Sequence, residues 1–323
     1  MEKRTLLCPN PTHSCTQHIN VMSTPPSTTS TLPKLSYAFS SALQDDLPTP
    51  NITCLNPSTL QVRGFVGAPS MIYEILLHAT ALGGNVNCIQ LPGSQPNATL
   101  EITESAQEAW LTWVGDTNYD LDAGTPASNF SYRGPDPHDS LVSLLAKADV
   151  PFTSILRGHV NDYKAGVIAP FSLDLGQKAH FDVPTDVLMS RYQVDASGNA
   201  DGNVFIDWLT FNFGRYLLFS SARGLLPANL QGKWAKDLEN PWWGSASSFF
   251  FTSFLTDLFA WAEQATVCRY LLPSSTTLLI LTPIALDINI QMNYWMAEIT
   301  NLDVTAPLFN FIEVRYQFRI AVD

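Results

Sequence analysis

The segment from Asp201 to Gly224 (DGNVFIDWLTFNFGRYLLFSSARG) constrains the fold most, because its apolar residues would surround a helix on every side. At 3.6 residues per turn, large apolar side chains fall all around the circumference. They are Phe205, Trp208, Leu209, Phe213, Tyr216 and Leu217. Such a helix must be covered on most sides, so we expect it inside a large multi-helix assembly. Gly224 marks its end.

Two shorter helices are predicted before it from their start signals. In DPHDSLVSLLAKA, Asp136 is placed as the N-cap and Pro137 as the first helical residue, and three leucines then share one face. VPTDVLMSRYQ starts in a similar way, with Pro184 near its beginning. Helices are therefore expected from residue 134 onward.

The region before residue 134 has a different pattern. Between Leu60 and Asp122, short apolar stretches are separated by Gly, Pro and Asn, which is typical of β-strands. From Ser23 to Pro57, Ser, Thr and Pro dominate and no apolar periodicity is visible. We predict a low-complexity, disordered arm over 1–59, a partial β-sandwich-like domain over 60–133, and a helical domain over 134–323.

Charge and cysteine content narrow the possible functions. The chain has 17 basic and 29 acidic residues, a formal net charge of -12, which repels nucleic acid and favours a neutral or polyhydroxylated partner. Its five cysteines follow no zinc-binding spacing, so no metal site is predicted. Their odd number leaves any disulfide assignment open.

The sequence signals for cellular location disagree with one another. Asn51, Asn97 and Asn129 each begin an N-glycosylation acceptor triplet, which suits a secreted glycoprotein. The segment from Met1 to Asn20 has no apolar core, so no signal peptide is predicted and the location stays open. The uncharged stretch LLPSSTTLLILTPIAL is shorter than the roughly 20 residues of a spanning helix, so no membrane partner is expected.

Two long sequence motifs carry a family resemblance. LPANLQGKWAKDLENPWWG (Leu226 to Gly244) and DINIQMNYWMAEITNL (Asp287 to Leu302) resemble signatures of the alpha-L-fucosidases of glycoside hydrolase family 95. The likeness extends over roughly 104–245 and 287–313. It implies an incomplete α/α (six-hairpin) toroid that removes terminal L-fucose from oligosaccharides or glycans by inversion, without a metal or cofactor. It also implies an extracellular protein.

The resemblance also implies the site residues. The family holds the attacking water with an Asn-x-Asn pair assisted by a carboxylate, and the matching triplet here is Asp287-Ile288-Asn289. Asn289 carries over directly, whereas Asp287 stands where the family has the first asparagine. Asp287 acts as a base, disturbs the site, or caps the following helix. The expected sugar contacts are Gln231, Trp234, Gln291 and Asn293.

Other features limit the expected activity. The resemblance places the general acid glutamate and the assisting carboxylate downstream of Asp323, so we expect a truncated chain with weak or no activity. Residues 245–286 form an atypical insert, which we interpret as retained non-coding sequence translated in frame. Two alternatives stay open: a non-catalytic carbohydrate-binding remnant, and an alpha-galactosidase-type specificity on the same scaffold.

Two His/Asp pairs are weaker candidates for a general base. His138 with Asp136 lies at a helix start, and His159 with Asp162 lies in a polar segment. Capping and surface hydrogen bonding explain both pairs better than catalysis.

Overall fold

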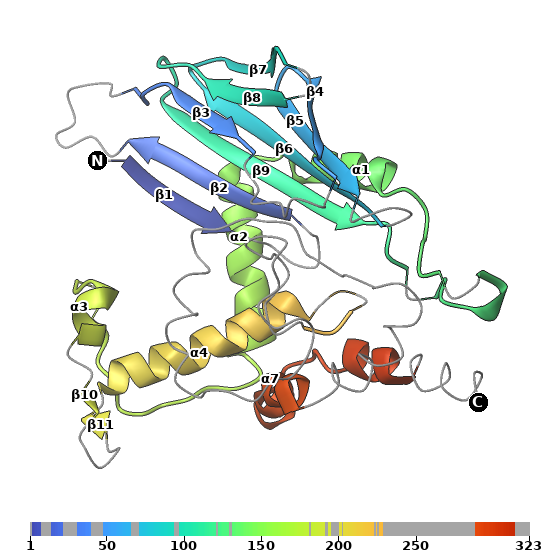
Figure 1. The fold of residues 1–323 in the computed structure, drawn as a ribbon. Helices are drawn as coiled ribbons and strands as arrows, with labels where there is room; N and C mark the ends of the chain where they lie inside the picture. The colour runs from blue at the N-terminus through green and yellow to red at the C-terminus, as the bar shows by residue number, and fades with distance from the viewer. Residues whose placement is uncertain are drawn as a thin grey trace.

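The computed structural model describes most of residues 31–228 and the segment 288–313. The described ranges are 2–7, 14–21, 31–39, 48–65, 71–93, 97–120, 122–128, 131–180, 182–190, 193–194, 200–201, 203–222, 224, 226–228 and 288–313. Only the backbone is described for 2–7, 14–21, 193–194, 200–201 and 288–291. A strand-rich region comes first and helices follow (Figure 1).

The strand-rich region consists of two antiparallel sheets. A six-stranded sheet has the order β1-β2-β9-β6-β5-β4. Its strands are β1 (Glu2–Leu7), β2 (Ser14–Val21), β9 (Glu108–Thr117), β6 (Ile72–Leu82), β5 (Thr59–Phe65) and β4 (Asn51–Asn56). A three-stranded sheet has the order β3-β8-β7, with β3 (Leu35–Ala38), β8 (Asn97–Ile102) and β7 (Val86–Leu91).

The main core lies between these sheets. On β8 the alternate residues Ala98, Leu100 and Ile102 are fully buried. They belong to one cluster with Leu60 and Val62 of β5. Because successive side chains of a strand point to opposite faces, this alternation gives each sheet one apolar inner face. The β-sandwich-like prediction is confirmed at the level of two antiparallel sheets.

A disulfide joins the two sheets. Cys54 of β4 is bonded to Cys88 of β7, with their Cα atoms 5.7 Å apart. Both side chains pack against the core between the sheets. The pairing that the odd cysteine count left open is therefore settled for these two residues.

The expected arm over 1–59 contains strands instead. β3 pairs with β8, Leu35 lying opposite Ile102, and β4 pairs with β5, Ile52 lying opposite Val62. Each of these strands offers only two inward apolar residues, too few for a visible period. Their partners come from later in the chain, so local periodicity could not reveal them. The domain boundaries themselves stay a prediction.

Helix α1 (His138–Ala148) covers the outer face of the six-stranded sheet. Leu141 and Leu145 pack there against Leu76 of β6 and Val114 of β9. Leu144 lies at the edge of this cluster, as its predicted position on the same face requires. The helix begins at His138, one residue later than predicted.

Helices dominate after α1. In the described residues they are α2 (Phe152–Tyr163), which continues into the π-helical turn η2 (Lys164–Ile168), α3 (Thr185–Ser190), α4 (Val204–Ser221) and α7 (Ile288–Ile299), with a further helix over 306–313. Short elements complete the description: η1 (Pro126–Ser128), β10 (Gln193–Val194) and β11 (Ala200–Asp201). A complete or partial toroid stays a prediction.

Helix α4 matches the prediction from its sequence. It runs from Val204 to Ser221, and Asn203 caps it by accepting hydrogen bonds from the N–H groups of Phe205 and Ile206. No residue of α4 after Val204 is exposed. It crosses below α2 and contacts η2 and α7 (Figure 1). Among the described residues, no helix is both long enough and apolar enough to cross a bilayer.

Candidate functional site

Helix α7, which carries the predicted catalytic residue Asn289, is hydrogen-bonded to the other signature motif. The backbone N–H of Ala228 donates a buried hydrogen bond of 2.8 Å to Oη of Tyr294 in α7. Ala228 belongs to the motif from Leu226 to Gly244, and Tyr294 belongs to the motif from Asp287 to Leu302. The two motifs are therefore in contact at this hydrogen bond, although dozens of residues separate them in the chain.

An apolar cluster supports this junction. Tyr294 and Ala297, on one side of α7, pack together with Leu218 and Phe219 of α4 and with Ala228. On the opposite side of α7, Trp295 is 57% exposed. Tyr294 is thus a core residue, whereas Trp295 is exposed at the surface.

Arg215 of α4 holds α7 at its other end. Its side chain is fully buried and donates to the backbone oxygens of Val167 (2.6 Å), Phe171 (3.2 Å) and Thr300 (3.4 Å). Among the described residues, no carboxylate pairs with this guanidinium. The oxygens of Val167 and Thr300 lie at the ends of η2 and α7, where helix dipoles favour a cation. Burial lowers the pKa of Arg215.

Two aromatic rings flank Arg215, and a glycine lies in the neighbouring turn η2. The guanidinium lies 5.2 Å from the ring centre of Phe171 and 5.8 Å from that of Phe211, within cation–π range. In η2, a side chain at Gly166 would run into the ring of Phe219. The glycine therefore leaves the space that the ring of Phe219 occupies.

The structure places the predicted site residues only in part. Asn293 is half-buried in α7, and Asn289 and Gln291 belong to the same helix, with only their backbone described. Asp287, directly before the first residue of α7, lies outside the described residues, as do Gln231 and Trp234. The insert 245–286 also lies outside them.

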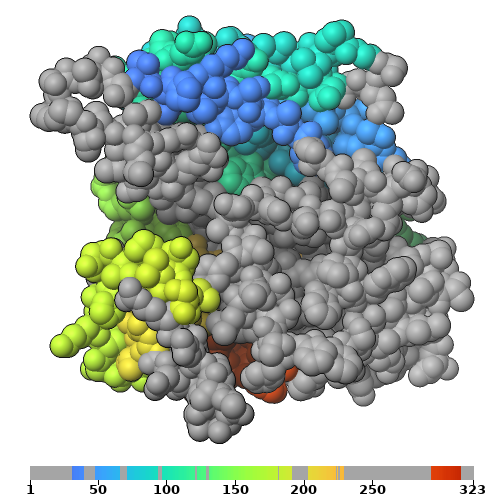
Figure 2. All heavy atoms as spheres, turned by 60° about the vertical axis from the view of Figure 1, so that its left-hand side comes forward, coloured from blue at the N-terminus to red at the C-terminus, as the bar shows by residue number. Residues whose placement is uncertain are grey.

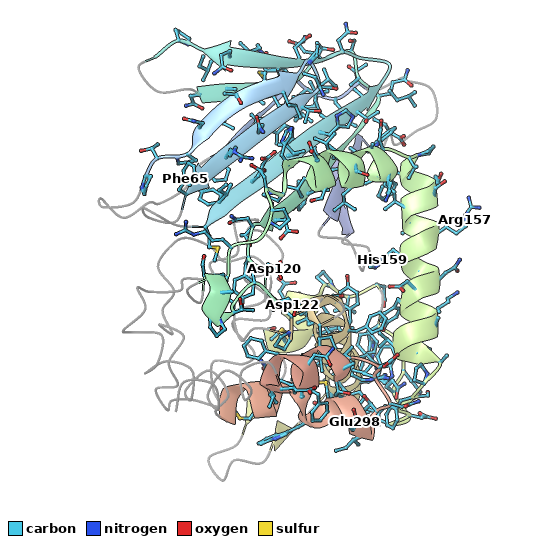
Figure 3. All side chains as sticks on the ribbon, turned by 90° about the vertical axis from the view of Figure 1, so that its right-hand side faces the viewer. Phe65, Asp120, Asp122, Arg157, His159 and Glu298 are labelled. Carbon is cyan, nitrogen blue, oxygen red and sulfur yellow. A yellow bond between two sulfur atoms is a disulfide. The ribbon has the colours of Figure 1, made fainter. Side chains whose placement is uncertain are left out.

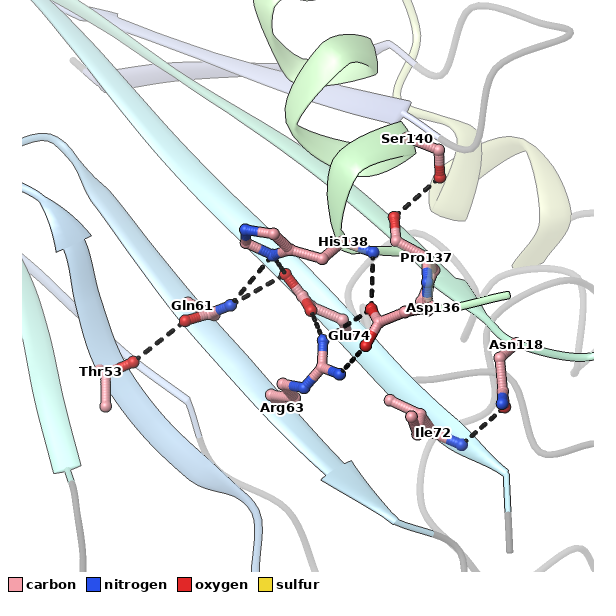
Figure 4. Close-up of polar contacts among 10 residues, drawn as sticks. All are labelled: Thr53, Gln61, Arg63, Ile72, Glu74, Asn118, Asp136, Pro137, His138 and Ser140. Carbon is pink, nitrogen blue, oxygen red and sulfur yellow. Dashed lines mark hydrogen bonds and ion pairs between the residues drawn. The ribbon is translucent and has the colours of Figure 1, made fainter. Parts of the chain in front are cut away.

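A second polar cluster lies between the six-stranded sheet and α1 (Figure 4). The carboxylate of Glu74, fully buried in β6, is bonded to Arg63 and to Nδ1 of His138 (2.7 Å). Gln61 Nε2 donates to the same carboxylate at 2.9 Å. Because a buried carboxylate is costly unless it is paired, this cluster fixes α1 on the sheet.

Asp136 closes this cluster at the start of α1. It forms an ion pair with Arg63 and accepts a hydrogen bond of 3.0 Å from the N–H of His138. The hydrogen bond from Arg63, followed by that from His138, lowers the pKa of the Asp136 carboxyl. Asp136 therefore bonds to the first residue of α1, as its place at the helix start suggested, but the N-cap position is Pro137 and not Asp136 as predicted.

His159 and Asp162 lie inside α2 and do not cap it. His159 projects from α2 on the side opposite to Arg157 (Figure 3), and its ring meets that of Tyr216 edge-on at 5.7 Å. Burial lowers the pKa of His159, and the charge of Asp162 opposes this effect. The expectation of surface hydrogen bonding is therefore wrong for His159, because α4 packs on that face of α2.

Comparison with known families now adds to this geometry. Residues 151–248, which include α2, α4 and the segment around Ala228, match the glycosyl hydrolase family 95 catalytic domain. The chain is thus similar to this family over the matched residues. Within the described residues, no group of three His, Cys, Asp or Glu side chains could hold a metal ion.

Named relatives agree with the family 95 match. The chain is 26% identical to "Probable alpha-fucosidase A" of Aspergillus niger, over 96% of this chain and 32% of that protein. It is 25% identical to the protein of the same name from Aspergillus oryzae, over 97% of this chain and 36% of that protein. Alpha-L-fucosidase 2 of Arabidopsis thaliana is 24% identical over 65% of this chain.

The chain corresponds to only a part of each Aspergillus relative. The chain spans about a third of the length of these two Aspergillus relatives, at 32% and 36%. The family 95 match itself covers residues 151–248 of this chain. We therefore give the activity of the whole protein only as a proposal.

Sequence reasoning missed two residues that organise the fold of this chain. Arg215 is the only basic residue of α4, and Glu74 is the only acidic residue of β6. A single charge inside a strongly apolar element must be buried and then needs partners. This signal was visible in the sequence, although the partners were not.

Proposed function

We propose that this chain is part of a glycosidase that removes terminal L-fucose from fucosylated oligosaccharides or glycans with inversion at the anomeric carbon. The observation that carries the proposal is the hydrogen bond between Ala228 and Tyr294, which brings the two signature motifs together. The family match over 151–248 supports it, as do the names of the relatives.

In the proposed mechanism, α7 positions the attacking water. Asn289 orients the water through its amide, which cannot accept the proton near neutral pH. Asp287 provides a carboxylate beside it, and a carboxylic acid on the other side of the sugar protonates the leaving oxygen. We assign the sugar hydroxyls to Gln231, Gln291 and Asn293. We assign the apolar face of the sugar to the flat ring of Trp234.

The test uses the whole protein of which this chain is a part, with an α-L-fucoside and an α-D-galactoside that carry the same fluorescent leaving group. We expect faster release from the fucoside, and proton NMR should show β-L-fucose as the first product. Replacing Asn289 by Ala should lower kcat by about 10²-fold. Asn310→Ala, at an exposed position of the helix over 306–313, is the matched control and should leave the rate unchanged.

Each other outcome rejects a stated part of the proposal. α-L-Fucose as the first product would exclude inversion, and preference for the galactoside would replace the substrate. Saturable L-fucose binding without release of the leaving group from either glycoside would favour a carbohydrate-binding remnant.

Asp287 has two proposed roles that a single substitution separates. The Asp287→Asn variant keeps a side chain that can cap α7 but removes the base. A fall in kcat with unchanged unfolding supports the base. Unchanged kcat assigns Asp287 to the start of α7, which begins at the next residue.

A further inference from the structure

We propose that Asn51 and Asn97 are modification sites that carry N-linked oligosaccharides. Asn51-Ile52-Thr53 and Asn97-Ala98-Thr99 are acceptor triplets, and the proposed hydrolase activity uses neither of them. A triplet alone occurs often by chance. The proposal therefore rests on where the fold places these two.

Both triplets begin a strand and place their polar residues outward. Ile52 is 8% exposed and Ala98 is fully buried, each in the core between the sheets. Because side chains alternate along a strand, the asparagine and the threonine on either side of each core residue point to the outer face. This geometry keeps the carboxamide and the hydroxyl of each triplet on the same side, away from the core.

The two carboxamides are also accessible. Asn51 and Asn97 are both exposed, and neither side chain bonds to another residue in the described part of the chain. Asn51 begins β4, the edge strand of the six-stranded sheet, opposite Arg63 of β5. A glycan on it would extend from an edge without displacing a packed side chain.

Asn97 lies on the other sheet. It begins β8 of the three-stranded sheet, whose outer face includes the exposed residues Ser36, Asn87 and Ile89. This sheet lies on the far side of the sandwich from α1 (Figure 1), and its strands reach the surface at the top of Figure 2. The two glycans would therefore leave from opposite outer faces.

The disulfide supports the same cellular compartment. Cys54 follows directly after the first triplet, and its bond to Cys88 requires an oxidising environment of the kind found in the secretory pathway. N-linked transfer takes place in that pathway. The donor class is an oligosaccharide linked to a lipid pyrophosphate. Nδ2 of the asparagine bonds to C1 of the sugar and loses one proton, while the C1–O bond breaks and the lipid pyrophosphate leaves with its electrons.

The test is peptide mapping of the full chain, expressed behind a cleavable secretion leader in eukaryotic cells. Secreted and membrane-enclosed chains are both collected, so that poor folding does not hide the result. Digestion with peptide N-glycosidase in heavy-oxygen water converts each glycosylated Asn to labelled Asp. We expect label at Asn51 and Asn97, and the loss of one glycan in each of Asn51→Gln and Asn97→Gln.

Matched variants separate the modification from a change in folding. Thr53→Ser keeps the acceptor triplet and should keep the glycan on Asn51, whereas Thr53→Ala should lose it. Asn56→Gln is the negative control, because Asn56-Pro57-Ser58 contains proline and cannot be an acceptor. An unlabelled peptide at Asn51 or at Asn97 in the membrane-enclosed fraction overturns the proposal for that position.

Discussion

The backbone N–H of Ala228 donates to the hydroxyl of Tyr294 across a sequence separation of 66 residues. This bond joins the segment that leads to Gln231 and Trp234 with the helix that carries Asn289 and Asn293. Because both partners are buried, the bond fixes the position of α7 more tightly than apolar packing alone would.

Removal of the Tyr294 hydroxyl should loosen this junction. We expect Tyr294→Phe to lower the free energy of unfolding by about 1–3 kcal/mol, since it leaves the buried N–H of Ala228 without a partner. Denaturant unfolding measures this change. Trp295→Phe, at a position 57% exposed in the same helix, should change it by less than about 0.5 kcal/mol. Equal effects of the two variants would contradict this role of the hydroxyl.

Replacement of Arg215 by lysine should destabilise the helical region. One ammonium group cannot reproduce the planar guanidinium that reaches the oxygens of Val167, Phe171 and Thr300. The loss of one charge-assisted hydrogen bond corresponds to about 1.5–3 kcal/mol of unfolding free energy. Arg157→Lys, at an exposed position of α2, is the matched control and should have little effect. Similar unfolding midpoints for both variants would contradict the prediction.

Loss of the disulfide should destabilise the β-sandwich. The Cys54–Cys88 bond closes a loop with a sequence separation of 34, for which chain entropy predicts about 3–4 kcal/mol. A Cys54→Ala/Cys88→Ala double variant should therefore unfold at lower denaturant concentration, followed by near-UV circular dichroism. Its midpoint should not respond to added reductant, whereas that of the unaltered chain should fall. If reductant leaves the unaltered chain unchanged, the bond does not contribute.

Asp136 should make a pH-dependent contribution to stability. Its folded-state pKa is lowered, chiefly by Arg63, so the contribution is full above the unfolded pKa of about 3.9 and is lost as pH falls through the lower folded pKa. Its side chain is 50% exposed, so solvent screening limits the ion pair to at most about 1 kcal/mol. The measured quantity is the difference in unfolding free energy between the chain and Asp136→Asn, from pH 7 to pH 3.

The control for this measurement is Asp139→Asn. Asp139 is exposed in the first turn of α1 and forms no ion pair with a described residue. Added salt should reduce the Asp136 difference at pH 7. A difference that grows as pH falls would have the wrong sign for a lowered pKa and would refute the assignment.

The predictions from sequence succeeded where a signal was local. The apolar circumference of 204–221 and the helix start at Asp136 both appear in the structure close to where they were expected. Strands β3 and β4 were not predicted, because two inward residues, such as Ile52 and Cys54 in β4, make no visible period. The predicted site residues Asp287, Gln231 and Trp234 lie outside the described residues, so their roles stay predictions.

The sequence by itself determined helices α1, α3 and α4 and the alternation of the core strands, because propensity, capping and periodicity act over a few neighbouring residues. Only the tertiary structure decided which distant groups meet. Glu74 with His138, Cys54 with Cys88, and Ala228 with Tyr294 are separated by 64, 34 and 66 residues. The physical reason is that such a pair depends on how the intervening chain folds back, which no local pattern records.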